Sequence, residues 1–207
     1  MWQKVMRRIA LIDGENLTYG LRTLLAGDGE ERAPRSVLNN YNFRGLVEDL
    51  LSDRIPSEII WFGARLRRYD NNEEIRVKSE AAIVLQAAFV NMLQNQKIIF
   101  HKVGYLRARE GEPCKDCGRR EWNLIEKGVD VGLAVKLLTE ANDQTELVVV
   151  SADTDLVPAF KAVRKTGAKI MHVGYEYRPS SALSSNADST RIISKPQASK
   201  YVENRLV

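Results

Sequence analysis

This 207-residue sequence has little that suits a secreted or membrane-spanning protein. It holds only two cysteines, Cys114 and Cys117, which are too few for a disulfide framework. The stretch from Met1 to Arg8 carries charges but no apolar run long enough for a secretory leader, and no segment approaches the roughly 20 apolar residues that cross a bilayer. These absences predict a cytoplasmic protein that does not contact a membrane.

The sequence also lacks a linker rich in proline, glycine and serine, and it lacks a glycine-rich phosphate-binding loop. Without a linker, we expect residues 1–207 to form a single domain, with a polar loop insertion at about residues 107–127. The hydrophobic fraction of 44% is normal for a globular chain and argues against disorder. The net charge of +4 suits a polyanionic partner, but it equally suits an ordinary solvated surface.

Apolar strands alternate with amphipathic helices along the chain, which is the pattern of a parallel sheet with helices on both faces. The expected strands are residues 8–13, 57–66, 97–106, 146–151, 169–174 and 190–193. The expected helices are residues 17–25, 43–51, 72–96, 129–141, 156–166 and 180–187. The sequence therefore predicts an α/β fold with a central, mainly parallel sheet.

Two of the expected strands end in carboxylates. The strand at residues 146–151 leads into Asp153 and Asp155, and the strand at residues 8–13 ends in Asp13. In open α/β sheets, ligands bind outside the carboxyl ends of the strands, where the strand order reverses. The sequence therefore predicts an acidic pocket at that edge of the sheet.

Asp130 is a further informative acid. In the helix expected at residues 129–141 it shares a face with Ala134, Leu137 and Leu138, so it should point toward the sheet rather than into water. The alternative is an acid at a helix start that only complements the helix dipole. Because the rest of this face is apolar, we favour a place for Asp130 in the pocket.

Each acid also has a purely structural interpretation. Asp13 could end a strand, while Asn16 and Asp155 could cap helices. Carboxylates gathered in one crevice, however, repel and raise one another's pKa unless a cation neutralises them. Oxygen ligands alone suit Mg²⁺ or Mn²⁺ rather than zinc, and such an ion activates water and stabilises charge on a phosphate in metal-dependent nucleases. We therefore expect a cation site formed by Asp13, Asp130, Asp153 and Asp155.

Three motifs surround these acids. They are residues 12–16 (Ile-Asp-Gly-Glu-Asn), residues 127–135 (Lys-Gly-Val-Asp-Val-Gly-Leu-Ala-Val) and residues 151–158 (Ser-Ala-Asp-Thr-Asp-Leu-Val-Pro). In this order they resemble the NYN domain, the LabA-like branch of the PIN-like ribonucleases. The resemblance runs from about Arg8 to Gly174, which is most of the chain, and three ordered motifs make it specific.

The resemblance implies a PIN-like three-layer α/β/α sandwich and a Mg²⁺- or Mn²⁺-dependent hydrolysis of RNA phosphodiesters. It implies catalytic and metal-binding roles for Asp13, Asp130, Asp153 and Asp155. It also implies that Asn16 supports the first aspartate and binds the substrate, and that Ser151, which matches the small hydroxyl residue before the third acid, contacts the substrate. A further acid of the site is expected within Glu73–Glu80, where no motif selects among Glu73, Glu74 and Glu80, and Glu126 beside the second motif is a weaker candidate. By analogy with PIN-like domains that pair, a homodimer is expected.

Basic residues follow two neighbouring strands of the expected sheet. They are Arg65, Arg67, Arg68, Arg107, Arg109, Lys115, Arg119, Arg120 and Lys127. If both segments leave the sheet at its carboxyl edge, these residues border the crevice and hold a phosphate backbone, with Tyr69, Tyr105 and Trp122 placed to stack bases. We therefore expect substrate contacts from Arg65, Arg67, Arg68 and Lys127. The alternative is that the loops are simply charged and solvated.

The remaining residues of interest have weaker signals. Cys114 and Cys117 form half of a zinc-ribbon pattern, which needs four ligands, so two free thiols are the expected state. His101 and His172 both fall on expected strands, where a packed or surface side chain is the expected role.

Two functions remain open from the sequence. The first is a metal-dependent ribonuclease that acts on single-stranded RNA, and the alternative is a non-catalytic RNA-binding or regulatory module with the same fold. A phosphatase of the haloacid-dehalogenase kind is disfavoured, because Asp13 is followed by Gly14 and Glu15 and the required Asp-x-Asp pair is missing after the first strand.

Overall fold

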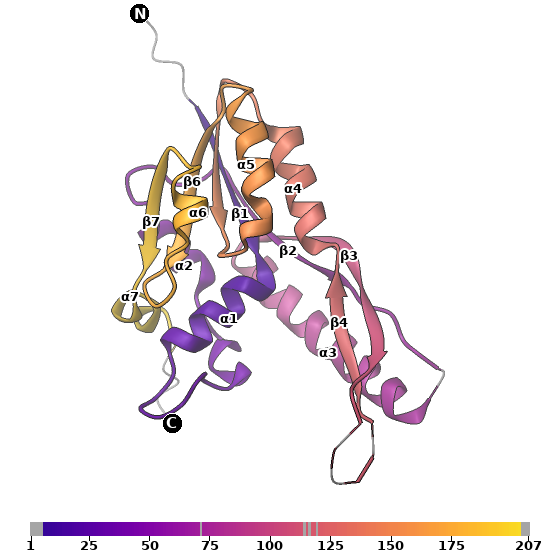
Figure 1. The fold of residues 1–207 in the computed structure, drawn as a ribbon. Coiled ribbons are helices and arrows are strands. Elements are labelled where there is room, and N and C mark those ends of the chain that lie inside the picture. Colours follow the sequence, from indigo (N-terminus) through magenta and orange to yellow (C-terminus); the bar gives the residue numbers. More distant parts are fainter. Residues whose placement is uncertain (1–5, 71, 114, 116, 119, 204–207) are drawn as a thin grey trace, which may run out of the picture.

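The computed structural model describes residues 6–70, 72–113, 115, 117–118 and 120–203. In this part of the chain, seven strands form one sheet that is covered by helices (Figure 1). The strands are β1 (Arg7–Asp13), β2 (Glu58–Arg65), β3 (Ile99–Glu110), β4 (Trp122–Lys127), β5 (Thr145–Val150), β6 (Lys169–Tyr175) and β7 (Ser189–Ile193). The helices are α1 (Gly14–Leu24), α2 (Phe43–Leu50), α3 (Glu73–Asn95), α4 (Val129–Glu140), α5 (Val157–Arg164), α6 (Ser181–Ser184) and α7 (Lys195–Lys200), with 3-10 turns at Arg35–Leu38 and Thr154–Leu156.

The sheet has the strand order β4-β3-β2-β1-β5-β6-β7, and all neighbours are parallel except β3 and β4. From β1, the chain first adds β2, β3 and β4 on one side and then returns to add β5, β6 and β7 on the other. This reversal is the topological switch point at which open α/β sheets leave a ligand crevice. The predicted α/β fold with a mainly parallel sheet is therefore confirmed, and its switch point lies between β1 and β5.

Helices cover both faces of the sheet and form two apolar cores. Helices α1, α2, α3 and α7 pack on one face, and α4, α5 and α6 pack on the other. Successive residues of β1 supply the two cores alternately, since Ala10 and Ile12 enter the first core while Ile9 and Leu11 enter the second. The arrangement confirms the predicted three-layer α/β/α sandwich.

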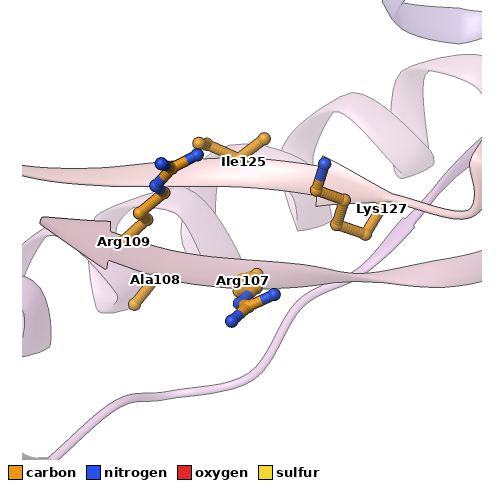
Figure 2. Close-up of a pocket in the computed structure, with 5 residues that line it drawn as sticks. All are labelled: Arg107, Ala108, Arg109, Ile125 and Lys127. Atoms are coloured by element: carbon orange, nitrogen blue, oxygen red, sulfur yellow. The ribbon is translucent and has the colours of Figure 1, made fainter. Parts of the chain in front are cut away.

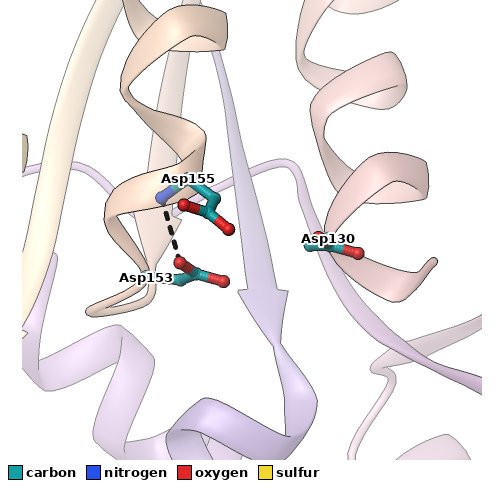
Figure 3. Close-up of side chains that lie close together, drawn as sticks. All are labelled: Asp130, Asp153 and Asp155. Atoms are coloured by element: carbon teal, nitrogen blue, oxygen red, sulfur yellow. Dashed lines mark hydrogen bonds between the residues drawn. The ribbon is translucent and has the colours of Figure 1, made fainter. Parts of the chain in front are cut away.

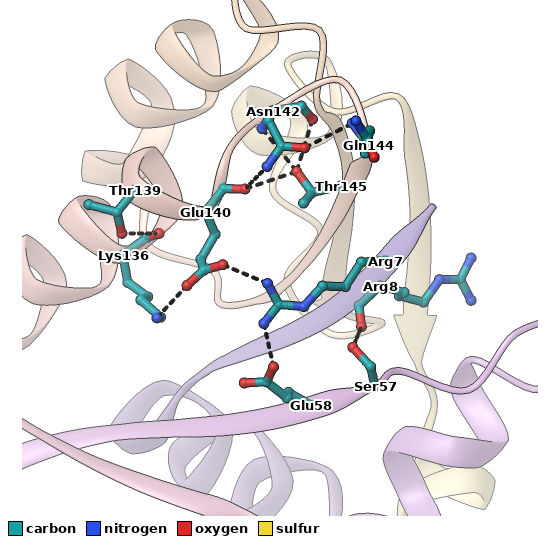
Figure 4. A network of polar contacts seen from close by, with 10 residues as sticks. All are labelled: Arg7, Arg8, Ser57, Glu58, Lys136, Thr139, Glu140, Asn142, Gln144 and Thr145. Atoms are coloured by element: carbon teal, nitrogen blue, oxygen red, sulfur yellow. Dashed lines mark hydrogen bonds and ion pairs between the residues drawn. The ribbon is translucent and has the colours of Figure 1, made fainter. Parts of the chain in front are cut away.

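Ion pairs hold together the strand ends opposite the crevice. The guanidinium of Arg8 is only 4% exposed, and its Nε lies 2.9 Å from Oε2 of Glu146. Arg7 pairs with Glu58 and Glu140, which connects β1 to β2 and to the end of α4 (Figure 4). Because a buried guanidinium is costly without a partner, these contacts fix the amino end of β1. The ion pairs thus give this edge of the sheet a structural role. The predicted acidic pocket belongs to the opposite edge, where the parallel strands have their carboxyl ends.

The stretch at residues 107–127, which the sequence predicts as a polar loop, is largely a β-hairpin. Strand β3 continues to Glu110, and Arg107 is paired with Ile125 across the antiparallel ladder of β3 and β4. Burial alternates residue by residue along β4, as in a strand with one solvated face. The charged residues on the outer face give the stretch the polar composition of a loop. The alternation of inward and outward side chains that is typical of a strand was therefore not recognised in the sequence.

The apolar pattern of residues 72–96 predicts a helix with one buried face, and α3 departs from that expectation. Its buried residues are Ile75, Ser79 and Leu93, whereas Val84 is 68% exposed and Leu85 is 70% exposed. No charged residue occurs between Ala81 and Gln96, so the sequence holds no charged face from which the buried side could be read. Among the helices of the described residues, none is long and apolar enough to span a membrane.

Candidate functional site

Two turns meet at the switch point, one after β1 and one after β5. Asp13 ends β1 and caps α1, since its Oδ1 accepts a hydrogen bond of 3.2 Å from the backbone N–H of Asn16. Helix α1 therefore begins at Gly14, and Asp13 rather than the predicted Asn16 is its N-cap. Asn16 instead accepts a hydrogen bond of 2.9 Å from the backbone N–H of Ala152, and the hydroxyl of Ser151 donates to Oδ2 of Asp13 at 3.0 Å. These contacts lock the two turns together.

A hollow of about 390 Å³ opens at these turns. Its described lining residues are Asp13, Glu15, Asn16, Tyr19, Glu126, Gly128, Val129, Asp130, Asp153 and Arg178. Five of these residues are acids and one is an arginine. An acidic hollow therefore lies at the edge of the sheet where the sequence predicts one.

Three carboxylates converge beside this hollow. Asp130, Asp153 and Asp155 each offer an oxygen, and the three oxygens lie within 4.8 Å of one another. Asp130 comes from the first turn of α4, whereas Asp153 and Asp155 come from the turn that precedes α5 (Figure 3). Asp153 caps the 3-10 turn, because its Oδ1 accepts a hydrogen bond of 3.0 Å from the backbone N–H of Asp155. The sequence analysis gave such a capping role to Asp155, as the alternative to metal binding, but in the structure Asp153 is the cap.

A left-handed glycine places Asp130 at the cluster. Gly128 has φ 78°, and with this one residue the chain passes from the end of β4 into α4. The buried face of α4 consists of Val129, Leu133 and Leu137, whereas Leu138 is 46% exposed. Asp130 is half-buried beside this face, so the predicted face of α4 was shifted by about one residue. The carboxylate consequently faces the crevice rather than the core.

Asp13 lines the same hollow but does not belong to the three-carboxylate cluster. Burial raises the pKa of its carboxyl from 3.8 to about 6, although hydrogen bonds from Asn16 and Ser151 oppose the change. The negative charge of Asp153 also raises this pKa, which indicates that the two carboxylates are close enough to interact. A cation nearby would relieve both the burial cost and this repulsion.

Glu126 is brought into the hollow by the hairpin. It lies at the end of β4, and its Oε1 accepts a hydrogen bond of 3.4 Å from the backbone N–H of Ala64. Burial raises the pKa of Glu126, and the charges of Glu15 and Asp13 act in the same direction. Of the two places where the sequence suggests a further acid, the structure thus puts Glu126 in the hollow.

Ser151 is fully buried, so it cannot touch a substrate in this conformation. Its Oγ donates to Asp13 and accepts a hydrogen bond of 3.1 Å from the backbone N–H of Asp153, so it positions both acids. Below it, the buried ring of His172 donates from Nε2 to the carbonyl of Ser151 at 2.9 Å, and Nδ1 accepts from Ser184 at 3.2 Å. Burial lowers the pKa of His172, which keeps the ring neutral in this role. The substrate contact predicted for Ser151 is therefore replaced by a positioning role.

The donor set fits a hard divalent cation. Carboxylate oxygens are the ligands that Mg²⁺ and Mn²⁺ prefer, and an ion at about 2.1 Å from each ligand holds two of them up to about 4.2 Å apart. The observed limit of 4.8 Å is slightly wider, and the exposed side chain of Asp155 can close the difference by rotating. Asp130, Asp153 and Asp155 are thus suited to hold such an ion.

The arginines at and after the end of β2 were predicted to contact the substrate, but they do not line the acidic hollow. Nε of Arg65 donates to the carbonyl of Lys102 at 3.3 Å, and the guanidinium of Arg67 lies 4.6 Å from the ring centre of Tyr69. Arg68 forms ion pairs with Asp70 and Glu80. None of the three arginines is among the described residues that line the acidic hollow.

The outer face of the hairpin carries a different set of cations. Arg107, Arg109 and Lys127 alternate along β3 and β4 with Tyr105 and Ile125, and all five side chains are exposed. Four of these residues, together with Ala108, line a second hollow of about 310 Å³ (Figure 2). In the described part of the chain, these three cations form no ion pair. We call these five residues the hairpin face, and its end at Lys127 adjoins Gly128 of the acidic hollow.

Three lining residues were not singled out from the sequence. Glu15 lies inside the first motif, but Tyr19 and Arg178 lie outside all three motifs. Tyr19 follows Glu15 and Asn16 by one helical turn, a spacing that could have indicated a shared face. No signal in the sequence marks Arg178. Of the predicted cysteine pair, Cys114 lies outside the described residues, and Cys117 is an exposed free thiol.

Comparison with known proteins agrees with this architecture. The chain aligns over 93% of its length with 96% of a protein of unknown function from Vibrio parahaemolyticus, at 17% identity and a TM-score of 0.57. This likeness concerns the fold alone. A phosphofructokinase-2 variant from Escherichia coli matches 81% of this chain and 54% of its own length at 12% identity, and its TM-score of 0.35 is too low to support an argument. No curated protein matches the chain.

The match to a family is more specific. The model of the NYN domain matches residues 8–194, which include both turns of the switch point and all five acids of the hollow. The fold, the three motifs and this match agree, and the chain belongs to the NYN domain family.

Proposed function

We propose that this protein is a metal-dependent ribonuclease of the LabA-like branch, which hydrolyses phosphodiester bonds of single-stranded RNA. The observation that carries the proposal is the convergence of Asp130, Asp153 and Asp155 at the switch point of the sheet. Unpaired carboxylates at such spacing are costly, and a bound cation offsets that cost. We include Asp13 as a fourth ligand because its buried carboxylate already interacts with the charge of Asp153.

The residues of the hollow have separate roles in this proposal. The four aspartates hold Mg²⁺ or Mn²⁺, which when bound supplies positive charge against the phosphate and activates water for hydrolysis. Ser151 and Asn16 fix the turns that carry the aspartates. Glu126 has a raised pKa in the same hollow, so it is suited to accept a proton from the attacking water.

The hairpin face is the proposed track for the RNA strand. Its three cations are exposed and form no ion pair in the described residues, so they are available to phosphates. Tyr105, which is 52% exposed, offers an aromatic surface between them. Because Lys127 adjoins the acidic hollow, a strand held on this face would lead into the site. Arg65, Arg67 and Arg68, which do not line the acidic hollow, are proposed as weaker, outer contacts.

The test is cleavage of a labelled single-stranded RNA with Mn²⁺, Mg²⁺ or EDTA. We expect the wild-type chain to cleave only with a divalent ion, and Asp130→Asn and Asp153→Asn to lose at least about 100-fold in rate, because each removes a charged ligand. The exposed Asp28→Asn makes the same change of charge away from the hollow and should keep full activity. If the wild type binds RNA without cleaving it, the ribonuclease assignment is wrong and the protein is the non-catalytic RNA-binding module.

A further inference from the structure

Among the described residues, one arginine lines the acidic hollow. Arg178 lies in the turn between β6 and α6, and its backbone N–H donates to the carbonyl of Tyr175 at 3.2 Å. Its side chain is exposed and lines the hollow together with Asp13 and Asp153. No ion pair of Arg178 is found within the described residues, although acids line the same hollow. The guanidinium therefore has free donors beside the proposed cation site.

An aromatic ring lies on the same hollow. Tyr19 is on α1, one turn after Asn16, and its side chain is 40% exposed. The guanidinium of Arg32 lies 4.7 Å from the ring centre, which fixes the ring and covers one of its faces. The part of the Tyr19 ring that Arg32 does not cover lines the hollow.

Arg178 lies across the site from the hairpin face, and Tyr19 lines the same hollow. In the sheet order, β3 and β4 lie on one side of the β1–β5 switch point, and β6, which leads to Arg178, lies on the other. A strand that enters over the hairpin face and passes the three aspartates would therefore leave toward Tyr19 and Arg178. An exposed ring beside an unpaired arginine suits a nucleotide, because the ring stacks on the base and the guanidinium binds the phosphate.

We propose that Tyr19 and Arg178 form a subsite for one unpaired nucleotide next to the scissile phosphate. The subsite rests on the proposed function, since it assigns the substrate strand a position on the far side of the cation site. In a duplex each base is stacked between its neighbours, so its face is not open to the ring of Tyr19. The subsite thus makes the protein select single-stranded RNA.

Binding can be measured without cleavage, by fluorescence anisotropy of a labelled single-stranded oligoribonucleotide in EDTA. We expect Tyr19→Leu to weaken binding by about ten- to a hundred-fold, the usual loss when a stacked aromatic ring is removed, while Tyr19→Phe keeps the ring and binds within about threefold of wild type. Arg178→Ala should weaken binding and lower the salt dependence by about one phosphate contact. Arg164→Ala, an exposed cation on α5, serves as the matched control and should change neither. Binding of duplex RNA should be unaffected by Tyr19→Leu.

The outcomes separate this proposal from the ribonuclease assignment. Selective loss of single-strand binding in Tyr19→Leu supports the subsite, even if the wild-type chain cleaves nothing. Equal binding by wild type and Tyr19→Leu, equal losses for single-stranded and duplex RNA, or no RNA binding at all would overturn it. If the wild type cleaves RNA and Tyr19→Leu cleaves with an unchanged KM, the ribonuclease stands and the subsite fails.

Discussion

Replacing Asp13 with asparagine should make the protein more stable in the absence of divalent ions. The pKa of Asp13 rises from 3.8 to about 6 on folding, mainly because the carboxyl is buried. Each pKa unit corresponds to about 1.4 kcal/mol, so the ionised carboxylate costs the folded state about 3 kcal/mol at neutral pH. Asparagine removes the charge and keeps an oxygen for the hydrogen bond from Asn16. After allowing for a weaker contact with Ser151, we expect a gain of about 2 kcal/mol in the free energy of unfolding.

The pH dependence gives the sign of this effect. Between pH 3.8 and about 6 the folded protein keeps a proton on Asp13 that the unfolded chain has lost, so wild-type stability falls as the pH rises through this window. The advantage of Asp13→Asn should therefore be complete at pH 8 and small at pH 4.5. Urea denaturation at both pH values in EDTA measures it, and for a chain of this length the gain at pH 8 corresponds to about 4–8 °C in Tm.

Divalent ions should reverse the order of the two proteins. Mn²⁺ binds the folded wild type and stabilises it by mass action, whereas Asp13→Asn lacks one charged ligand and gains less. Asp28→Asn, an exposed acid, controls for the change in net charge and should follow the wild type. If Asp13→Asn is less stable than wild type at pH 8 in EDTA, the carboxylate is not under the burial cost described here, and the argument for a cation beside it fails.

Three further substitutions test the supports of the site. Ser151→Ala should weaken Mn²⁺ binding by about 10- to 100-fold in isothermal titration calorimetry, because Asp13 loses a donor, and an unchanged affinity would contradict its positioning role. Arg8→Ala should lower the free energy of unfolding by about 1.5–3 kcal/mol in urea, because Glu146 and Asp53 lose their hydrogen bonds to the buried guanidinium although Glu146 keeps its ion pair with Arg54, and a loss below about 0.5 kcal/mol would show that Arg8 does not hold the strand ends. Gly104→Ala should lower the Tm more than Gly118→Ala: both glycines have positive φ, but a Cβ at residue 104 would lie 2.2 Å from a carbonyl oxygen of β4, whereas residue 118 has open space. Equal shifts in the two proteins would contradict the close approach.

The sequence predicted most of what depends on local signals. Asp13 ends an apolar strand, and this local pattern is enough to predict its place. Parallel strands in this class of fold have their carboxyl ends at one edge of the sheet, so an acid that ends such a strand lies at that edge. Asp153 and Asp155 were expected at this edge for the same reason, whereas Asp130 was expected there because it lies in the first turn of a helix and beside an apolar face. The three-layer fold followed from the alternation of strands and helices.

Other features depend on distant contacts and could not be read from local pattern. Arg178 reaches the hollow only because β6 lies beside β5, which is a property of strand order rather than of neighbouring residues. Arg65, Arg67 and Arg68 follow a strand as expected, but the chain carries them away from the crevice to partners such as Tyr69. The hairpin was hidden because its outer side chains are charged, and a charged strand has the composition of a loop.

The position of β1 in the middle of the sheet determines when the proposed site can form during synthesis of the chain. β1 is made first but pairs with β5, which the ribosome adds about 140 residues later, and at about 5–20 residues per second this delay lasts roughly 7–28 s. Until β5 emerges, Asp13 has no neighbouring turn, and Asp153 and Asp155 do not yet exist. The proposed cation site is therefore incomplete in a nascent chain until β5 and the turn that carries Asp153 and Asp155 have been made.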